Sequence, residues 1–223
     1  MPQLLNEQIT AQIKDIFGGL KYPVQVLLFT SKDNCDYCDD TRQLLEEVTA
    51  LDDRIGLSVY DLHADADLAK HYRVDKAPGI VIAAKEGDQI TDMGVQYSGI
   101  PSGHEFSTLI NAILMVSGRD SGLSPQTREF IQKLEKPLHL QVFVTPTCPY
   151  CPRAVLLAYQ VAMENPAMVR GEGIEAMEFP ELSDRYHVSG VPQTTINDGH
   201  GTVVGAVPEQ ALLSEIMRAV KMQ

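Results

Sequence analysis

The sequence predicts an α/β protein of two similar units in tandem, each with a central mixed four-stranded sheet flanked by helices. Two observations carry this prediction. Segments 16–38 and 130–151 match, because each reads as a helix end, a turn, an apolar strand and a Cys-x-x-Cys pair. Segments 72–82 and 186–196 also match, and each has a proline at the same place. A duplication of this kind is considered before any local pattern.

The spacing of the landmarks supports the duplication. Cys148 follows Cys35 by 113 residues, and Pro192 follows Pro78 by 114. The segment 117–126 between the repeats is polar and contains two glycines and a proline, which is typical of a linker. The expected units are therefore residues 1–118 and 119–223.

Each unit shows the same order of elements. The first strand of each is β-branched and nearly all apolar, which is typical of a strand buried on both faces. A helix follows each cysteine pair, and a two-strand hairpin and a closing helix end each unit. In the first unit the other elements are expected at about 4–17 (helix), 24–30 and 57–62 (strands), 65–72 (helix), 78–84 (strand) and 103–116 (helix). In the second they are expected at about 125–135 (helix), 138–144 and 173–179 (strands), 180–186 (helix), 192–197 (strand) and 208–220 (helix).

The charge balance narrows the partners. The formal net charge of −12 argues against nucleic acid, whose phosphates need a basic surface, and against anionic membranes. The first 17 residues lack the basic and apolar regions of a signal peptide, and no apolar run approaches the roughly 20 residues that span a bilayer. We therefore expect a cytoplasmic protein, in which cysteines rarely form a structural disulfide framework.

The two cysteines of each pair are expected to differ. Cys38, Thr41 and Leu45 fall at helical spacing on one face, as do Cys151, Val155 and Ala158, so the second cysteine faces the core. The first, Cys35 or Cys148, should be exposed at the helix N-terminus, where backbone N–H groups favour a thiolate. One helical turn brings the two Cα atoms to about 5–6 Å, within disulfide range.

Three interpretations of the cysteines remain open. A zinc site needs four ligands, so both pairs would have to meet across an interface. A purely structural pair of disulfides fits the expected compartment poorly. Thiol–disulfide exchange needs only one pair per site, with an exposed nucleophile and a shielded resolving thiol.

Two prolines mark a second feature of each site. Ala77-Pro78 and Val191-Pro192 follow the short helix and precede a strand. A trans proline at a strand start is the ordinary interpretation, since only about 5–6% of X–Pro bonds in folded proteins are cis. Their duplicated placement favours the cis form.

These residues resemble the thioredoxin superfamily, and more closely its two-domain, glutaredoxin-like protein disulfide oxidoreductases. The resemblance covers almost the whole chain, and "CPYC" is the glutaredoxin-type motif. It implies two thioredoxin-fold units that exchange disulfides with protein substrates in redox homeostasis, without a bound cofactor or metal. It implies electrons from a thioredoxin-reductase-like flavoprotein, with Cys35 and Cys148 as nucleophiles and Cys38 and Cys151 as resolving thiols.

The resemblance also implies a substrate-binding edge at each site. Pro78 and Pro192 would be the cis-prolines beside the disulfides, and Ala77 and Val191 would present their backbone to an extended substrate. Tyr37 and Tyr150, inside the motifs, could line the substrate groove or pack on the adjacent loop.

The sequence departs from thioredoxin at the acid six residues before the first cysteine. Phe29 and Val142 occupy those positions. The proton relay must then use water or another group; Glu178 and Asp61, expected on the second strands, are weak candidates beside the ordinary role of a solvated or hydrogen-bonded acid.

The two sites are unequally charged. Cys35 is surrounded by Asp33, Asp36, Asp39 and Asp40, whereas the second motif has no acid and is followed by Arg153. Negative neighbours raise a thiol's pKa, so Cys148 is expected to be the more reactive thiol and its pair the more oxidising. The same aspartates also complement the dipole of the helix they begin.

The sequence thus predicts an enzyme of dithiol–disulfide exchange. An alternative is an electron-relay module between a flavoprotein and a peroxidase, similar to the N-terminal region of alkyl hydroperoxide reductase flavoproteins. That region usually keeps one cysteine pair, so two intact pairs favour the first hypothesis. A metal-binding or holdase module is a third class.

Overall fold

The computed structural model describes residues 3–222. Its α-helices are α1 (Glu7–Phe17), α2 (Cys38–Thr49), α3 (Ala66–His71), α4 (Glu105–Gly118), α5 (Pro125–Gln132), α6 (Cys151–Glu164), α7 (Pro180–Arg185) and α8 (Glu209–Lys221). Its strands are β1 (Val24–Thr30), β2 (Ile55–Asp61), β3 (Gly79–Glu86), β4 (Gln89–Ser98), β5 (Leu138–Val144), β6 (Val169–Glu175), β7 (Gln193–Ile196) and β8 (Gly201–Val204). A 3₁₀ turn, η1 (Asn197–Gly199), joins β7 to β8.

The strands form one mixed eight-stranded sheet in the order β2-β1-β3-β4-β6-β5-β7-β8. The first four and the last four repeat one arrangement, with β1 and β2, or β5 and β6, parallel and the other two strands antiparallel. This confirms the predicted fold class. The sequence did not predict that the two sheets join, through parallel pairing of β4 with β6 from Val95↔Gly171 to Ser98↔Ile174.

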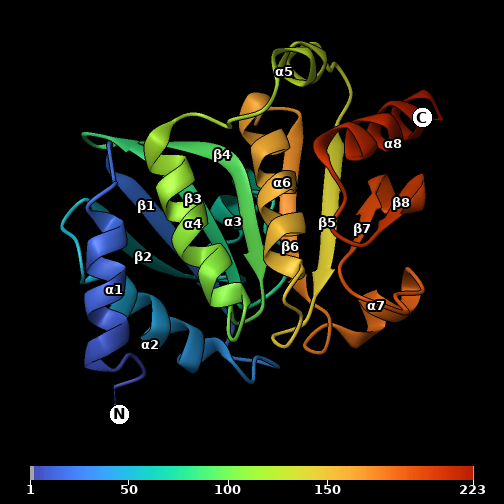
Figure 1. The fold of residues 1–223 in the computed structure, drawn as a ribbon. Helices are drawn as coiled ribbons and strands as arrows, with labels where there is room; N and C mark the ends of the chain where they lie inside the picture. Colours follow the sequence, from blue (N-terminus) through green and yellow to red (C-terminus); the bar gives the residue numbers. More distant parts are fainter. Residues whose placement is uncertain (1–2, 223) are drawn as a thin grey trace.

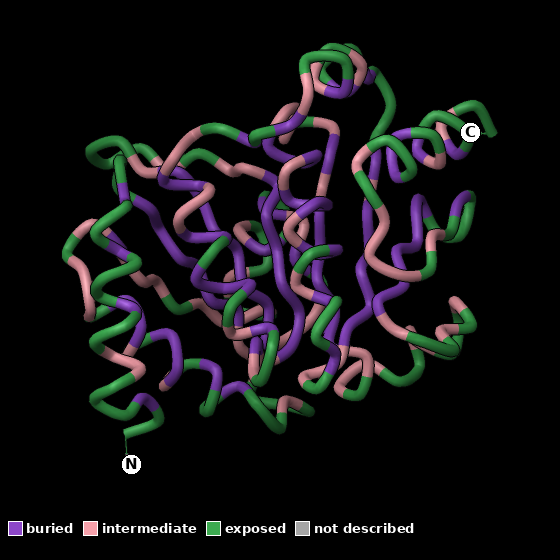
Figure 2. The backbone as a smooth tube through the Cα atoms, in the orientation of Figure 1, coloured by how far each residue is buried: buried purple, intermediate pink, exposed green. Residues whose placement is uncertain are grey.

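Helices cover both faces of this sheet. In Figure 1, α4 and α6 lie side by side in front of the strands and α3 lies behind them. Figure 2 shows the central strands buried along most of their length. The main core unites residues from both units, whereas a smaller core of Leu27, Phe29, Tyr72 and neighbours lies under α3. No helix within residues 3–222 is long and apolar enough to cross a membrane.

Two glycines in β6 set the distance between α6 and the sheet. A Cβ on Gly171 would lie 2.6 Å from the Ala158 carbonyl oxygen of α6, and one on Gly173 would lie 2.6 Å from the Tyr97 ring. Only glycine therefore allows this close approach of helix and strand. Since α6 begins at Cys151, the glycines also help to position the second cysteine pair.

A buried charge network joins the units at the β4–β6 seam. The Glu172 carboxylate, 2% exposed, accepts a hydrogen bond from Ser98 Oγ at 2.6 Å and lies 2.9 Å from Lys76 Nζ, both in the first unit. Its other oxygen lies 2.7 Å from His139 Nε2, and Arg170 is 3.6 Å away. Burial opposes ionisation, but Lys76, the hydrogen bond with His139 and Arg170 outweigh it and hold the pKa of Glu172 well below its usual range.

Several element boundaries follow the prediction, but one strand differs. The first strands, β1 and β5, begin and end where expected. The strand expected at 173–179 is β6, which ends four residues earlier at Glu175. Arg170, Gly171 and Gly173 are poor strand formers, so their part of β6 gave little β pattern. Its backbone pairs on both sides, with β4 and β5, and this tertiary pairing decides its position.

The boundary between units falls in an irregular segment. Helix α4 ends at Gly118, Arg119 adopts a left-handed conformation with φ 55°, and α5 begins at Pro125 with Ser124 as its N-cap. The predicted start of this helix at about residue 125 is confirmed. The division at 118 and 119 stays a prediction.

Candidate functional site

Both cysteine pairs lie at one edge of the sheet. Cys35 and Cys148 are in the loops that leave β1 and β5, and the strands β1, β4, β5 and β6 run parallel, so their carboxyl ends share that edge. Each pair is joined by a disulfide with its Cα atoms 5.5 Å apart. Helices α2 and α6 begin at the second cysteine, so the first cysteine lies in the preceding turn rather than in the helix itself.

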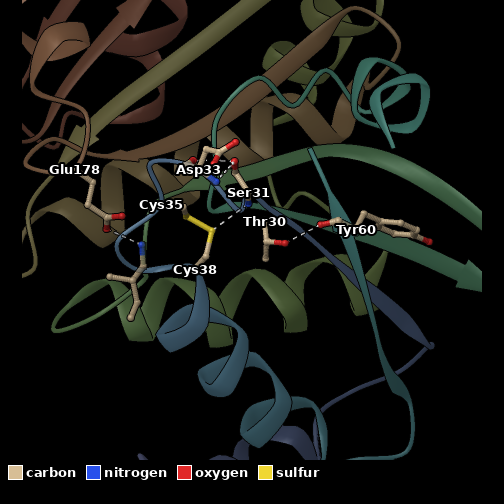
Figure 3. The surroundings of a disulfide bond; sticks show 8 residues. Thr30, Ser31, Asp33, Cys35, Cys38, Tyr60 and Glu178 are labelled. Carbon is tan, nitrogen blue, oxygen red and sulfur yellow. Dashed lines mark hydrogen bonds between the residues drawn. A yellow bond between two sulfur atoms is a disulfide. The ribbon is translucent and has the colours of Figure 1, made fainter. Parts of the chain in front are cut away.

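The second cysteine of each pair is shielded, as expected. Cys38 is 6% exposed and Cys151 is 0% exposed, and the Ser31 N–H donates a hydrogen bond to Cys38 Sγ at 3.4 Å (Figure 3). Cys35 is partly exposed, which also fits the expectation. Cys148 does not, because it is only 7% exposed and belongs to the main core.

The first unit contacts the loop that carries Cys148. The His104 N–H, just before α4, donates a hydrogen bond to the Pro146 carbonyl at 2.9 Å. A Cβ on Gly103 would lie 2.3 Å from the same oxygen, and Gly103 has a φ of 58°. The loop before α4 is therefore pressed against the loop that carries Cys148. The expectation of an exposed Cys148 was wrong because it treated each unit alone.

The two prolines are placed alike in both units. The Ala77-Pro78 and Val191-Pro192 bonds are both cis. The Pro78 carbonyl accepts a hydrogen bond from Gly99 N at 2.9 Å, and the Pro192 carbonyl accepts one from Gly205 N at 2.8 Å. The prolines themselves are buried, while Ala77 and Val191 are partly exposed. Each site thus has the same three segments at its rim: the cysteine loop, the proline loop and the turn after the hairpin.

The two tyrosines point to solvent more than to a core. Tyr37 is 45% exposed and Tyr150 is 70% exposed, and each is the residue before its helix. Their role in a substrate groove stays a prediction. The four aspartates around Cys35 are all exposed, with Asp39 and Asp40 in the first turn of α2, where they complement its dipole.

A buried acid that the sequence did not single out lies beside the second site. Glu105 begins α4 directly after the loop that contacts Pro146, is 0% exposed, and neither of its carboxylate oxygens has a hydrogen-bond partner. Burial raises the pKa of Glu105 to about 7; Thr108, on the next turn, partly offsets this without a hydrogen bond of good geometry. In the sequence, Glu105 looks like an ordinary first-turn acid.

The two weak candidates for a proton relay have different surroundings. Asp61 ends β2 and accepts hydrogen bonds from the N–H groups of His63 and Ala64, which hold its pKa below the usual value. It is the hydrogen-bonded strand acid of the ordinary interpretation. Glu178 is not on a strand, since it follows β6 in the loop before α7. Within residues 3–222, no cluster of three His, Cys, Asp or Glu side chains could hold a metal ion.

Comparison with known proteins identifies this arrangement. A family model described as a thioredoxin domain matches residues 138–218. The structure of a protein disulfide oxidoreductase from Aeropyrum pernix K1 superposes with a TM-score of 0.88 at 29% identity, covering 98% of this chain and 94% of that one. Over nearly its whole length, the chain is similar to a two-domain oxidoreductase of the thioredoxin superfamily. The predicted resemblance is confirmed.

The chain is also similar to a component of alkyl hydroperoxide reductases. The alkylhydroperoxide reductase component AhpF from Enterococcus faecalis V583 superposes with a TM-score of 0.85 at 27% identity, covering 96% of this chain and 100% of that chain. The corresponding alkyl hydroperoxide reductase component of Staphylococcus aureus (strain NCTC 8325 / PS 47) is 28% identical over 213 residues. The chain spans 38% of the length of that curated relative.

Fold and cysteines together define the chemistry. The chain carries two Cys-x-x-Cys pairs at equivalent places of two thioredoxin-fold units, and this supports dithiol–disulfide exchange. The division of roles among Cys35, Cys38, Cys148 and Cys151 remains a prediction.

Proposed function

We propose that the protein exchanges disulfides with protein substrates through both cysteine pairs. The observation that carries the proposal is the repeated rim of each site, where a partly exposed residue, Ala77 or Val191, precedes a cis-proline at the sheet edge that also carries the disulfides. An extended peptide that pairs with this backbone would bring its own disulfide to Cys35 or Cys148. Electrons would come from a thioredoxin-reductase-like flavoprotein.

The alternative is a relay between a flavoprotein and a peroxidase, and it rests on the likeness to the alkyl hydroperoxide reductase component AhpF. We favour protein substrates because both cysteine pairs are intact.

The two functions differ in what the reduced protein acts on. With dithiothreitol as the source of electrons, we expect the protein to reduce insulin disulfides at least tenfold faster than dithiothreitol alone, as thiolate exchange requires. The matched measurement replaces insulin by an oxidised two-cysteine peroxidase. Reduction of the peroxidase without reduction of insulin would favour the relay.

We infer that Glu105 accepts the proton of the second dithiol. It is buried, unpaired, and at the start of the helix whose preceding loop contacts the loop of Cys148. A carboxyl with a pKa of about 7 is suited to accept and return a proton at neutral pH.

Replacing this acid has a predictable effect on stability. Because the folded pKa of Glu105 lies above its unfolded value of 4.5, its cost is absent below pH 4.5 and grows as the pH rises to about 7. We expect Glu105→Gln to be up to about 3 kcal/mol more stable than the wild type at pH 8, with the difference falling to about 1 kcal/mol at pH 5. Urea unfolding at both pH values measures this.

The same variant should exchange more slowly at the second site. Glu129→Gln, an exposed glutamate on α5, is the control and should change neither property. Equal stability of Glu105→Gln and wild type at pH 8 would show that Glu105 is not a buried, ionising acid.

A further inference from the structure

Exchange at the first site needs a group that accepts the proton of the Cys35–Cys38 dithiol, and the acids of the first unit are poorly placed for this. Phe29 occupies the place of the missing acid and is fully buried, and Asp61 is engaged by backbone N–H groups. The aspartates of the cysteine loop are exposed. We propose that Glu178, a residue of the second unit, accepts and returns the proton of the Cys35–Cys38 dithiol. This inference rests on the proposed exchange function.

The position of Glu178 is fixed by contacts across the seam. Its Oε1 accepts a hydrogen bond from the Ile100 N–H of the first unit at 2.7 Å. Gly99, the preceding residue, donates its N–H to the Pro78 carbonyl at 2.9 Å. The carboxylate thus lies two hydrogen bonds from the cis-proline loop. Figure 3 shows it among the residues around the disulfide, on the side of Cys35.

Gly99 makes room for this acid. It has a φ of 102°, and a Cβ there would lie 2.7 Å from Glu178 Oε1 and 2.7 Å from Glu175 Cβ. A larger residue would therefore displace the carboxylate from the rim of the site. The turn after β4 accepts the second unit's acid because it carries no side chain at this point.

The electrostatic setting suits a proton acceptor. Burial raises the pKa of Glu178 to about 7; the Ile100 N–H lowers it and the Glu175 carboxylate raises it. A general base works best when its pKa lies near the working pH. Glu175 and the Tyr97 hydroxyl interact with Glu178 directly. The charged groups that line the same pocket are Asp75, Lys76, Glu181 and Arg185.

The proposed step conserves atoms and electrons. The Cys35 thiolate attacks a substrate disulfide, which forms a mixed disulfide and releases one substrate thiolate. Glu178 takes the remaining proton of the dithiol, so that the Cys38 thiolate attacks Cys35 and expels the second substrate thiolate. Glu178 then returns the proton to the substrate. The dithiol loses two electrons and the substrate disulfide gains them.

The test isolates each site in the full-length chain. In a Cys148→Ser/Cys151→Ser background only the first site is active, and in a Cys35→Ser/Cys38→Ser background only the second is. Each background receives Glu178→Gln or the control Glu181→Gln, an exposed glutamate in the first turn of α7. Insulin reduction is measured from pH 5.5 to 9.

We expect Glu178→Gln to slow insulin reduction by the first site at least tenfold at pH 7.5. General acid–base catalysis typically contributes about 10²–10⁴-fold to a rate. The rise in rate near pH 7 should move toward pH 8.5, the ordinary region of a thiol. The second site and the Glu181→Gln variant should keep their profiles, and the retained second site shows that the fold is intact.

Two results would overturn the inference: an unchanged profile at the first site, or an equal loss at both sites, which indicates a structural role. A first site that reduces no insulin even with Glu178 present would contradict the proposed function there, and the inference with it. The cases are distinguishable because the backgrounds without a Glu178 change report the exchange function alone.

Discussion

Replacing both Cys35 and Cys148 by serine is expected to abolish disulfide exchange, and the single variants are expected to lose unequal shares of it. A serine hydroxyl does not supply the thiolate that attacks a disulfide, so the double variant should fall to the rate of dithiothreitol alone. Insulin reduction at pH 7 measures all three variants. Cys38 and Cys151 remain in each, which keeps the shielded side of the sites unaltered.

The unequal shares follow from charge. The aspartates around Cys35 should hold its pKa above that of Cys148, so Cys148 carries more thiolate at neutral pH. A thiolate of lower pKa is less nucleophilic, but this offsets only part of the advantage. Cys35→Ser should then keep more than half of the activity and Cys148→Ser less than half.

Burial acts against this order, because desolvation raises the pKa of a thiol and Cys148 is only 7% exposed in the disulfide form. Alkylation of the reduced protein across pH decides between charge and burial. If Cys35 reacts at lower pH than Cys148, the burial at the second site outweighs the aspartates of the first, and the predicted order is wrong.

Glu172→Ala is expected to be the most destabilising single change at the seam. It leaves Lys76 and Arg170 without their buried carboxylate and removes the acceptor of Ser98. Removing one partner of a buried ion pair costs about 3–5 kcal/mol. With a urea m-value of about 2–3 kcal/mol/M, the midpoint of unfolding should fall by roughly 1–2 M.

The pH dependence gives this prediction a second measurement. Because the folded pKa of Glu172 is lowered, its stabilisation is present above pH 4.5 and is lost only as the pH falls below that value. The deficit of Glu172→Ala should therefore be the same at pH 5 as at pH 7. Glu181→Ala is the exposed control, and an equal unfolding midpoint for the two variants would contradict the role of the network.

Local sequence patterns could predict each unit but not their union. The strands β1 and β5 are apolar on both faces, so their positions could be read residue by residue. The position of strand β6 could not be predicted in this way. Its Gly171, Glu172 and Gly173 fit contacts with α6 and with the first unit rather than a local strand pattern. Nothing in a single strand indicates which edge will pair with it.

The residues of the candidate site also fall into those that the sequence could predict and those that it could not. The cysteines and the prolines are marked by spacing and duplication, and both cis bonds were anticipated from that duplication. Glu105 and the cover over Cys148 were missed because they depend on the packing of one unit against the other. Glu178 was noticed as an acid, but only the contact with Ile100 places it beside the first disulfide.

The seam also raises the question of where such a sheet stops growing. It pairs the last strand of one unit with the second strand of the next, and a junction of this head-to-tail kind has no built-in end, because every added unit offers a fresh last strand. The last strands of the two units, β4 and β8, differ in length. β4 has ten residues, whereas its counterpart β8 has four, and a short edge strand gives an incoming chain few backbone groups to pair with. The short β8 of the second unit therefore offers an incoming strand less than half of the backbone that β4 offers to β6.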